Sequence, residues 1–115
     1  MKLKSTVNSS GVAKEIWFAC GVADALYRII AGVEVTVTAM KDGQHMSGSL
    51  HAKGLAVDLR TRMLGLAQGD TILAGLQAAL EPLGFDVVDE RGKTGAPHFH
   101  VEFQAKGSEK FLVKE

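Results

Sequence analysis

Residues 97–104 read PHFHVEFQ, and polar and apolar side chains alternate along this stretch. The apolar positions are Phe99, Val101 and Phe103, and the polar positions between them are His98, His100 and Glu102. A period of two is typical of a β-strand with one buried and one solvent-facing side. We therefore expect both histidines on one face of a sheet, roughly 6.5 to 7 Å apart.

A second stretch, LAVDLR at 55–60, alternates in the same way. Its apolar positions are Leu55, Val57 and Leu59, and its other face carries Ala56, Asp58 and Arg60. If the two strands are antiparallel neighbours, their polar faces coincide and Asp58 meets the two histidines. His51, in the Gly-rich and Ser-rich loop at 41–53, can reach the same place, whereas His45 could line the site or face solvent.

The rest of the chain supplies two helices and two more strands. Apolar spacing predicts a helix over 10–31, with Ser9 or Ser10 as N-cap and Gly32 as the stop, and a second over 69–84, with Asp70 as N-cap and Gly84 as the stop. We assign Trp17 and Cys20 to packing in or beside the core. Strands are expected at 33–39 and 85–90, the latter joined to the His-bearing strand by a loop at 91–96. This pattern predicts an α+β fold with a mostly antiparallel sheet, two main helices on one face and a metal site on the other.

Composition indicates a single domain over residues 1–115 and excludes some partners. Thirteen basic and thirteen acidic side chains cancel, so no overall field attracts nucleic acid or an anionic membrane. One cysteine allows no internal disulfide, and the first residues lack the apolar run of a secretory signal. We expect a monomer made in a bacterial cytoplasm without a signal peptide.

Two imidazoles and one carboxylate suit a borderline divalent ion, above all zinc, in a four-coordinate site whose remaining position holds water. An open position indicates catalysis, because closed structural sites more often use cysteines. The alternative is that these histidines and Asp58 are ordinary solvated residues, which is the better interpretation for any one of them alone. The clustered set on matching strand faces favours the metal site.

These residues resemble a known family. SLHAKGLAVDL at 49–59 is similar to the Ser-x-His-x-x-Gly-x-Ala-x-Asp signature, and HFHVEF to the His-x-His strand, of zinc D-Ala-D-Ala carboxypeptidases and their relatives among bacteriophage endolysins and Hedgehog signalling domains. The resemblance covers about residues 33–104. It implies that His51, Asp58 and His100 are the zinc ligands, and that His98 is the near-metal histidine that contacts the reacting group.

The resemblance also implies a catalytic carboxylate a few residues before the last ligand. Here Gly95, Ala96 and Pro97 precede His98, and the nearest upstream acids are Asp89 and Glu90. Relatives place a glutamate where this strand ends, so Glu90 is predicted as the base, with 91–97 forming a longer hairpin loop.

A peptide substrate that ends in a carboxylate needs a cationic or hydroxyl partner. Lys41, Ser47, Ser49 and Arg60 are the candidates, and Ser49 and Arg60 are the best placed. Glycines at 43, 48 and 54 are expected to let the ligand-bearing loop turn tightly.

The function expected from this resemblance is zinc-dependent hydrolysis of peptide bonds in peptidoglycan stem peptides. Both the D-Ala-D-Ala carboxypeptidase and the L-Ala-D-Glu endopeptidase types remain open, because pocket shape decides between them. A phage or prophage endolysin, acting on the cell wall after release, is the expected setting. The alternative is a non-catalytic zinc-containing cell-wall-binding or virion component.

Overall fold

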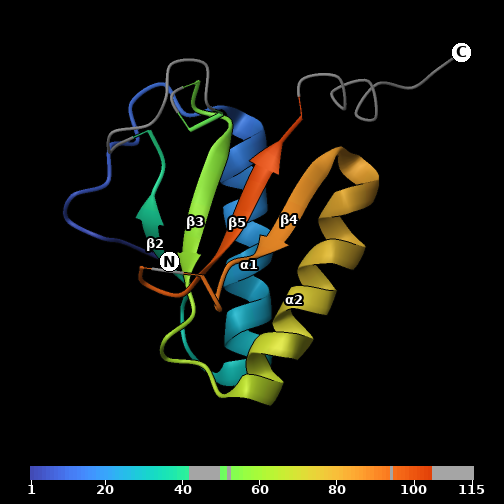
Figure 1. Cartoon of the computed structure of the whole chain (residues 1–115). Coiled ribbons are helices and arrows are strands. Elements are labelled where there is room, and N and C mark those ends of the chain that lie inside the picture. The colour runs from blue at the N-terminus through green and yellow to red at the C-terminus, as the bar shows by residue number, and fades with distance from the viewer. Residues whose placement is uncertain (42–49, 52, 94, 105–115) are drawn as a thin grey trace, which may run out of the picture.

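The computed structural model describes residues 1–41, 50–51, 53–93 and 95–104, and these form an α+β fold (Figure 1). The elements in chain order are β1 (Lys2–Leu3), α1 (Lys14–Ala31), β2 (Thr36–Ala39), β3 (Ala56–Arg60), α2 (Leu66–Leu80), the short 3₁₀ helix η1 (Glu81–Leu83), β4 (Phe85–Asp89) and β5 (His98–Phe103). The expected α+β class and the two main helices are confirmed.

The sheet has the strand order β1-β2-β3-β5-β4 and is mixed. The strands β2, β3, β5 and β4 pair antiparallel to one another, but β1 pairs parallel to β2. The expectation of a mostly antiparallel sheet is therefore wrong. The prediction lacked β1, the strand that pairs parallel. β1 has only two residues, which is too short for a periodic sequence pattern.

In Figure 1, α1 lies behind the sheet and α2 lies alongside β4, and the hydrophobic core fills the space between the helices and one sheet face. α1 contributes buried residues such as Ile16 and Tyr27, and α2 contributes Ile72 and Leu76. Cys20 is fully buried in this core, as its position in the helical pattern predicts. Among the described helices, none is long and apolar enough to cross a membrane.

The beginnings of both helices differ from the prediction, while their ends agree with it. α1 begins at Lys14 after Ala13 as N-cap, because the Ala13 N–H donates to the Gly54 carbonyl and this tertiary contact fixes the chain there. It ends at Gly32, whose φ of 69° is left-handed.

α2 begins at Leu66 rather than near Asp70, and its N-cap is Gly65, whose N–H donates to the Gln68 side chain at 2.9 Å. Asp70 instead forms an ion pair with Arg91. The helical region ends at Gly84, with a φ of 98°, as expected.

The second face of the sheet carries polar side chains and is opposite the helices. In β5, Phe99, Val101 and Phe103 are buried while the residues between them are half-buried. In β3, Val57 and Leu59 are buried in the core, so Asp58 and Arg60 lie on the opposite face.

Candidate metal centre

The pairing of β3 with β5 brings the predicted site residues together. The register is antiparallel and places Asp58 opposite His100 and Arg60 opposite His98. Since directly opposed residues point to the same face of a sheet, all four side chains share the polar face. The expected neighbouring of these two strands is confirmed.

His51 reaches this face from the turn that precedes β3. The Gly54 N–H donates to the His51 carbonyl at 2.9 Å, and the Leu55 N–H donates to the Leu50 carbonyl at 2.7 Å. Gly54 has a φ of +74°, and a Cβ at that position would lie 2.6 Å from the Gly11 carbonyl oxygen. Only glycine fits this turn, which also accepts a hydrogen bond from Ala13, the N-cap of α1, and precedes the strand that carries Asp58.

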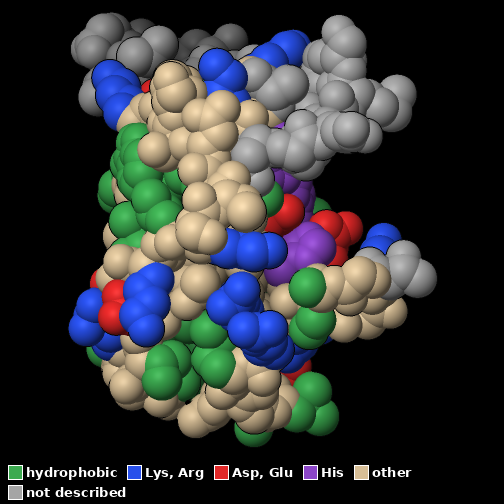
Figure 2. Space-filling model, turned by 90° about the vertical axis from the view of Figure 1, so that its left-hand side faces the viewer, with side chains coloured by type: hydrophobic (Ala, Val, Ile, Leu, Met, Phe, Trp, Pro, Cys, Tyr) green, Lys and Arg blue, Asp and Glu red, His purple; other side chains and the backbone are tan. Residues whose placement is uncertain are grey.

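Donor atoms of His51, Asp58 and His100 converge on one small volume. Asp58 Oδ1 lies 3.3 Å from His51 Nε2 and 2.9 Å from His100 Nδ1, and donor atoms of the three residues all lie within 4.8 Å of one another. Figure 2 shows histidine side chains at the surface directly beside acidic ones. These three residues form a group that could hold a metal ion.

The outer nitrogen of each ligand imidazole already has an acceptor. His51 Nδ1 lies 2.6 Å from the Met40 carbonyl oxygen, and His100 Nε2 lies 2.7 Å from Glu102 Oε1. Carbonyl and carboxylate oxygens only accept, so these two nitrogens carry protons. The nitrogens left to face Asp58 and a metal ion are Nε2 of His51 and Nδ1 of His100.

The electrostatics of the group centre on Asp58. Burial raises the pKa of this carboxyl, but hydrogen bonds from His100 and His51 outweigh burial and hold it well below its usual range. Burial lowers the pKa of His100, and the Asp58 and Glu102 carboxylates more than reverse this, raising it to about 9. The pKa of His51 is also raised, because Asp58 outweighs the opposing effect of burial. In the absence of a metal, protons therefore lie between the carboxylate and both rings.

The donor set fits zinc. Zinc bonds of about 2.0–2.2 Å to nitrogen and oxygen in a tetrahedral arrangement place neighbouring donors about 3.3 Å apart. The distances of 2.9 and 3.3 Å from Asp58 Oδ1 are close to this value. A divalent cation would take the place of the protons that face Asp58, and the outer hydrogen bonds would persist.

His98 lies beside this group and is paired with Glu90. Its Nε2 lies 2.9 Å from Glu90 Oε1 and 3.8 Å from Asp58 Oδ1, and its Nδ1 lies 2.9 Å from the Ala96 carbonyl oxygen. Each ring nitrogen of His98 thus lies at hydrogen-bond distance from an oxygen, one from a backbone carbonyl and one from a carboxylate. Glu90 and His98 form a hydrogen-bonded pair next to the candidate metal position.

Asp89 has a different role from Glu90. Its carboxylate accepts hydrogen bonds from the Arg91 backbone N–H and guanidinium, at 2.9 to 3.1 Å, and Arg91 also pairs with Asp70 of α2 at 2.8 Å. The side chain of Arg91 lies over the Phe99 ring, 5.2 Å from its centroid. Asp89 therefore ties the end of β4 to α2, and of the two acids only Glu90 contacts a site histidine.

Of the predicted substrate-binding residues, the structure places Arg60 beside the site. It lies opposite His98 on the polar face, and its guanidinium has no ion pair with any described residue. The Lys41 ammonium lies close to Gly11, and it forms no ion pair with a described site residue. The other predicted loop residues, Ser47, Ser49, His45 and the glycines at 43 and 48, lie outside the described residues.

Glu102 is a site residue to which the sequence analysis assigned no role. It continues the alternation His98, His100, Glu102 along one face of β5, and this same-face position is the signal that could have identified it.

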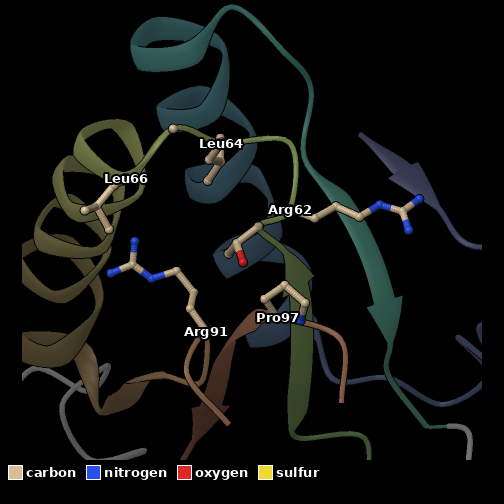
Figure 3. Close-up of a pocket in the computed structure, with 7 residues that line it drawn as sticks. Arg62, Leu64, Leu66, Arg91 and Pro97 are labelled. Atoms are coloured by element: carbon tan, nitrogen blue, oxygen red, sulfur yellow. The ribbon is translucent and has the colours of Figure 1, made fainter. Parts of the chain in front are cut away.

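A separate pocket of about 270 Å³ lies at the end of the sheet, outside the histidine cluster (Figure 3). It is lined by Thr61, Arg62, Leu64, Gly65, Leu66, Arg91 and Pro97. Arg91 extends toward α2, whereas Arg62 points away from the other lining residues. Its one inward guanidinium is already paired to Asp70 and Asp89, and the other lining side chain with a hydrogen-bonding group near it is the Thr61 hydroxyl.

Comparisons with models of protein families and with curated proteins give no match to this chain.

Proposed function

We propose that this chain is a zinc metallopeptidase that hydrolyses peptide bonds in peptidoglycan stem peptides. The observation that carries the proposal is the Glu90–His98 pair next to the candidate ligand group, with Asp58 Oδ1 only 3.8 Å from His98 Nε2. A solely structural metal site has no need of a hydrogen-bonded carboxylate–imidazole pair beside the ligands.

Zinc, when bound, would supply a Lewis acid that polarises the peptide carbonyl and acidifies water. His51 Nε2, Asp58 Oδ1 and His100 Nδ1 would hold it. These three atoms come from one turn and two adjacent strands, so the backbone fixes their spacing before any metal arrives.

Glu90 and His98 carry the proton transfers in this proposal. Glu90 Oε1 accepts a proton from the attacking water and delivers it to the leaving amine. Negative charge develops on the carbonyl oxygen as the water attacks, and His98 Nε2 donates a hydrogen bond to this oxygen until the amine leaves. The hydrogen bond from Nδ1 to the Ala96 carbonyl keeps the ring oriented so that Nε2 faces the site.

Arg60 is the proposed anchor for a substrate carboxylate. Arg60 and His98 form the next pair on this face after Asp58 and His100. Among the described residues, Arg60 has no acidic partner. A guanidinium in this position can bind a carboxylate in bidentate fashion and direct the adjacent peptide bond toward the ligand group.

The proposed substrate class and the setting of a phage or prophage endolysin rest on the resemblance of SLHAKGLAVDL and HFHVEF to the carboxypeptidase family. The D-Ala-D-Ala carboxypeptidase and L-Ala-D-Glu endopeptidase activities are both compatible with the described residues.

The test is peptide release from purified cell walls of several peptidoglycan chemotypes, followed by mass spectrometry of the fragments. We expect the zinc-loaded protein to release fragments, the chelated protein to release none, and added zinc to restore the release. A protein that sediments with walls and releases nothing in any state would instead be a non-catalytic wall-binding or virion component. Full activity after verified metal removal would exclude the metal mechanism.

A further inference from the structure

We propose that Glu102 is a positioning residue of the metal centre, which orients His100 so that its Nδ1 faces the metal. This inference rests on the proposed metal site and extends it beyond the three ligands. Glu102 Oε1 lies 2.7 Å from His100 Nε2, the nitrogen on the far side of the ring from Asp58.

Glu102 is itself held in place by a short chain of hydrogen bonds. Its second oxygen, Oε2, accepts from Gln104 Nε2, and the same amide nitrogen donates to Asp86 Oδ2 at 2.9 Å. Asp86 is opposite Glu102 in the pairing of β4 with β5. The carboxylate is thus fixed by two adjacent strands, and it leaves one oxygen for the imidazole.

The ring of His100 has two nitrogens that could each bind a metal, and a half turn about its Cβ–Cγ bond would turn Nδ1 away from Asp58 and bring Nε2 to that side of the ring. With Glu102 as a fixed acceptor on one side, the favoured state has a hydrogen on Nε2 and a lone pair on Nδ1 for the metal. For His51, the backbone carbonyl of Met40 has the equivalent function. Each ligand ring therefore has a built-in acceptor on its outer nitrogen.

The two acceptors differ in kind. The Glu102 carboxylate is a charged side chain that a substitution can remove, whereas the Met40 carbonyl is neutral backbone and remains in every variant. A carboxylate partner raises the basicity of the ligand nitrogen more than a neutral carbonyl does. Loss of such an outer partner commonly lowers metal affinity about 10- to 100-fold. His100, with its side chain 17% exposed, would then depend on a single half-buried carboxylate for its orientation.

The experiment measures zinc affinity by competition with a chromophoric chelator in wild type, Glu102→Ala, Glu102→Gln and the control Glu81→Gln. Both Glu102 variants should bind zinc about 10- to 100-fold more weakly. Gln should fail as a substitute, because its NH₂ group would face one of the two donors, His100 or Gln104. Glu81→Gln removes an exposed carboxylate charge in η1, outside the hydrogen bonds that hold His100 and Glu102, so its affinity should stay within about twofold of wild type.

A second readout is NMR of the ¹⁵N-labelled, ¹¹³Cd-loaded protein. We expect scalar coupling of cadmium to His100 Nδ1 in wild type, together with an observable His100 Nε2 proton that exchanges faster with water in both Glu102 variants. If the substitutions only destabilised the fold, exchange with water would become faster for many protons and not selectively for the His100 Nε2 proton. Coupling at Nε2 of His100 in wild type would overturn the inference.

The outcomes separate this inference from the function on which it rests. If wild type takes up no zinc, the metal site and the proposed function fail together with the inference. If wild type binds zinc tightly and both folded Glu102 variants bind it equally well, the inference alone is wrong. If Glu81→Gln is as weak as the Glu102 variants, general charge rather than orientation of His100 accounts for the loss, and the inference is again overturned.

Discussion

At the scale of single residues, one oxygen atom organises the site. Oδ1 of Asp58 lies 2.9 Å from His100, 3.3 Å from His51 and 3.8 Å from His98, measured to the nearest ring nitrogen. A single anion that faces three imidazoles must be compensated by protons or by a metal ion. The low pKa of Asp58, which its two hydrogen-bonded imidazoles bring about against the effect of burial, is a consequence of this arrangement.

The neighbouring acids Asp89 and Glu90 should respond differently to removal of their charge. Glu90→Gln should remain zinc-loaded but lose about 10²- to 10⁴-fold in the rate of peptide release, because the proton acceptor is gone. Asp89→Asn should keep most of the rate and lose only about 0.5–1 kcal/mol of stability, since it weakens the exposed link to Arg91. Rates and zinc content of the two purified variants check this.

The reverse order of the two rates would rule out Glu90 as the base. Near-normal rates in both variants would instead make His98 the group that moves the proton, because its Nε2 is the next titratable atom at the site.

Strand alternation was sufficient to predict the faces of Asp58, His98 and His100, because burial of the intervening apolar residues leaves only one register for a strand. It could not choose between Asp89 and Glu90, since both faces of 85–90 mix apolar and acidic residues. The structure distinguishes them through Arg91, a partner from the following turn, and through Asp70 on a distant helix. Contacts between elements are not visible in local periodicity.

At the scale of elements, the turn that contains His51 and Gly54 determines where the His51 ring lies. We expect Gly54→Ala to destabilise the protein by at least about 1–2 kcal/mol, because alanine is strained at positive φ and its Cβ would meet the Gly11 backbone. The variant should also bind zinc more weakly, since the His51 ring would be displaced.

Two other glycines provide controls for Gly54→Ala. Gly92→Ala has open space around its Cβ and an ordinary φ, so it should change neither property. Gly21→Ala, on the exposed face of α1, should stabilise the fold by about 0.5–1 kcal/mol. Equal melting temperatures for Gly54→Ala and wild type in thermal unfolding would contradict this account of the turn.

α1 is tied to β2 by Asp24, and this link predicts a dependence of stability on pH. Partial burial opposes the shift, but hydrogen bonds from Arg28 at 2.9 Å and from the Val35 N–H at 3.0 Å hold the pKa of Asp24 below its ordinary value. A carboxyl with a lower pKa in the folded state stabilises the fold above its unfolded pKa of about 3.9, and this contribution is lost as the pH falls through the folded value.

Asp24→Asn should therefore lower the free energy of unfolding by about 1–2 kcal/mol at pH 7 and by much less near pH 2. Urea unfolding of both proteins at several pH values measures the difference. A difference that is constant from pH 7 to pH 2 would mean that the charge of Asp24 does not contribute.

The ends of the helices were more predictable than their beginnings, and for a local reason. Gly32 and Gly84 stop the helical segments through their own left-handed conformation, which only their residue type determines. The beginnings depend on other parts of the chain, as in the contact from Ala13 to Gly54. The two-residue strand β1 is likewise defined only by its pairing with β2.

At the scale of the whole molecule, the sheet separates stability from chemistry. The face toward α1 and α2 holds the core, and the opposite face carries the carboxylates and imidazoles of the site. Because these side chains contribute little to the core, substitutions at the site should leave the domain folded and change mainly metal binding and rate. The same separation makes the central claim, one metal ion on the polar face, accessible to direct observation.

The most direct measurement is anomalous X-ray diffraction at the zinc edge from crystals of the zinc-loaded protein. We predict one strong anomalous peak per chain, about 2.0–2.2 Å from His51 Nε2, Asp58 Oδ1 and His100 Nδ1, with His98 and Glu90 outside the coordination sphere. The absence of such a peak at full zinc loading, or a peak bound by other residues, would contradict the account.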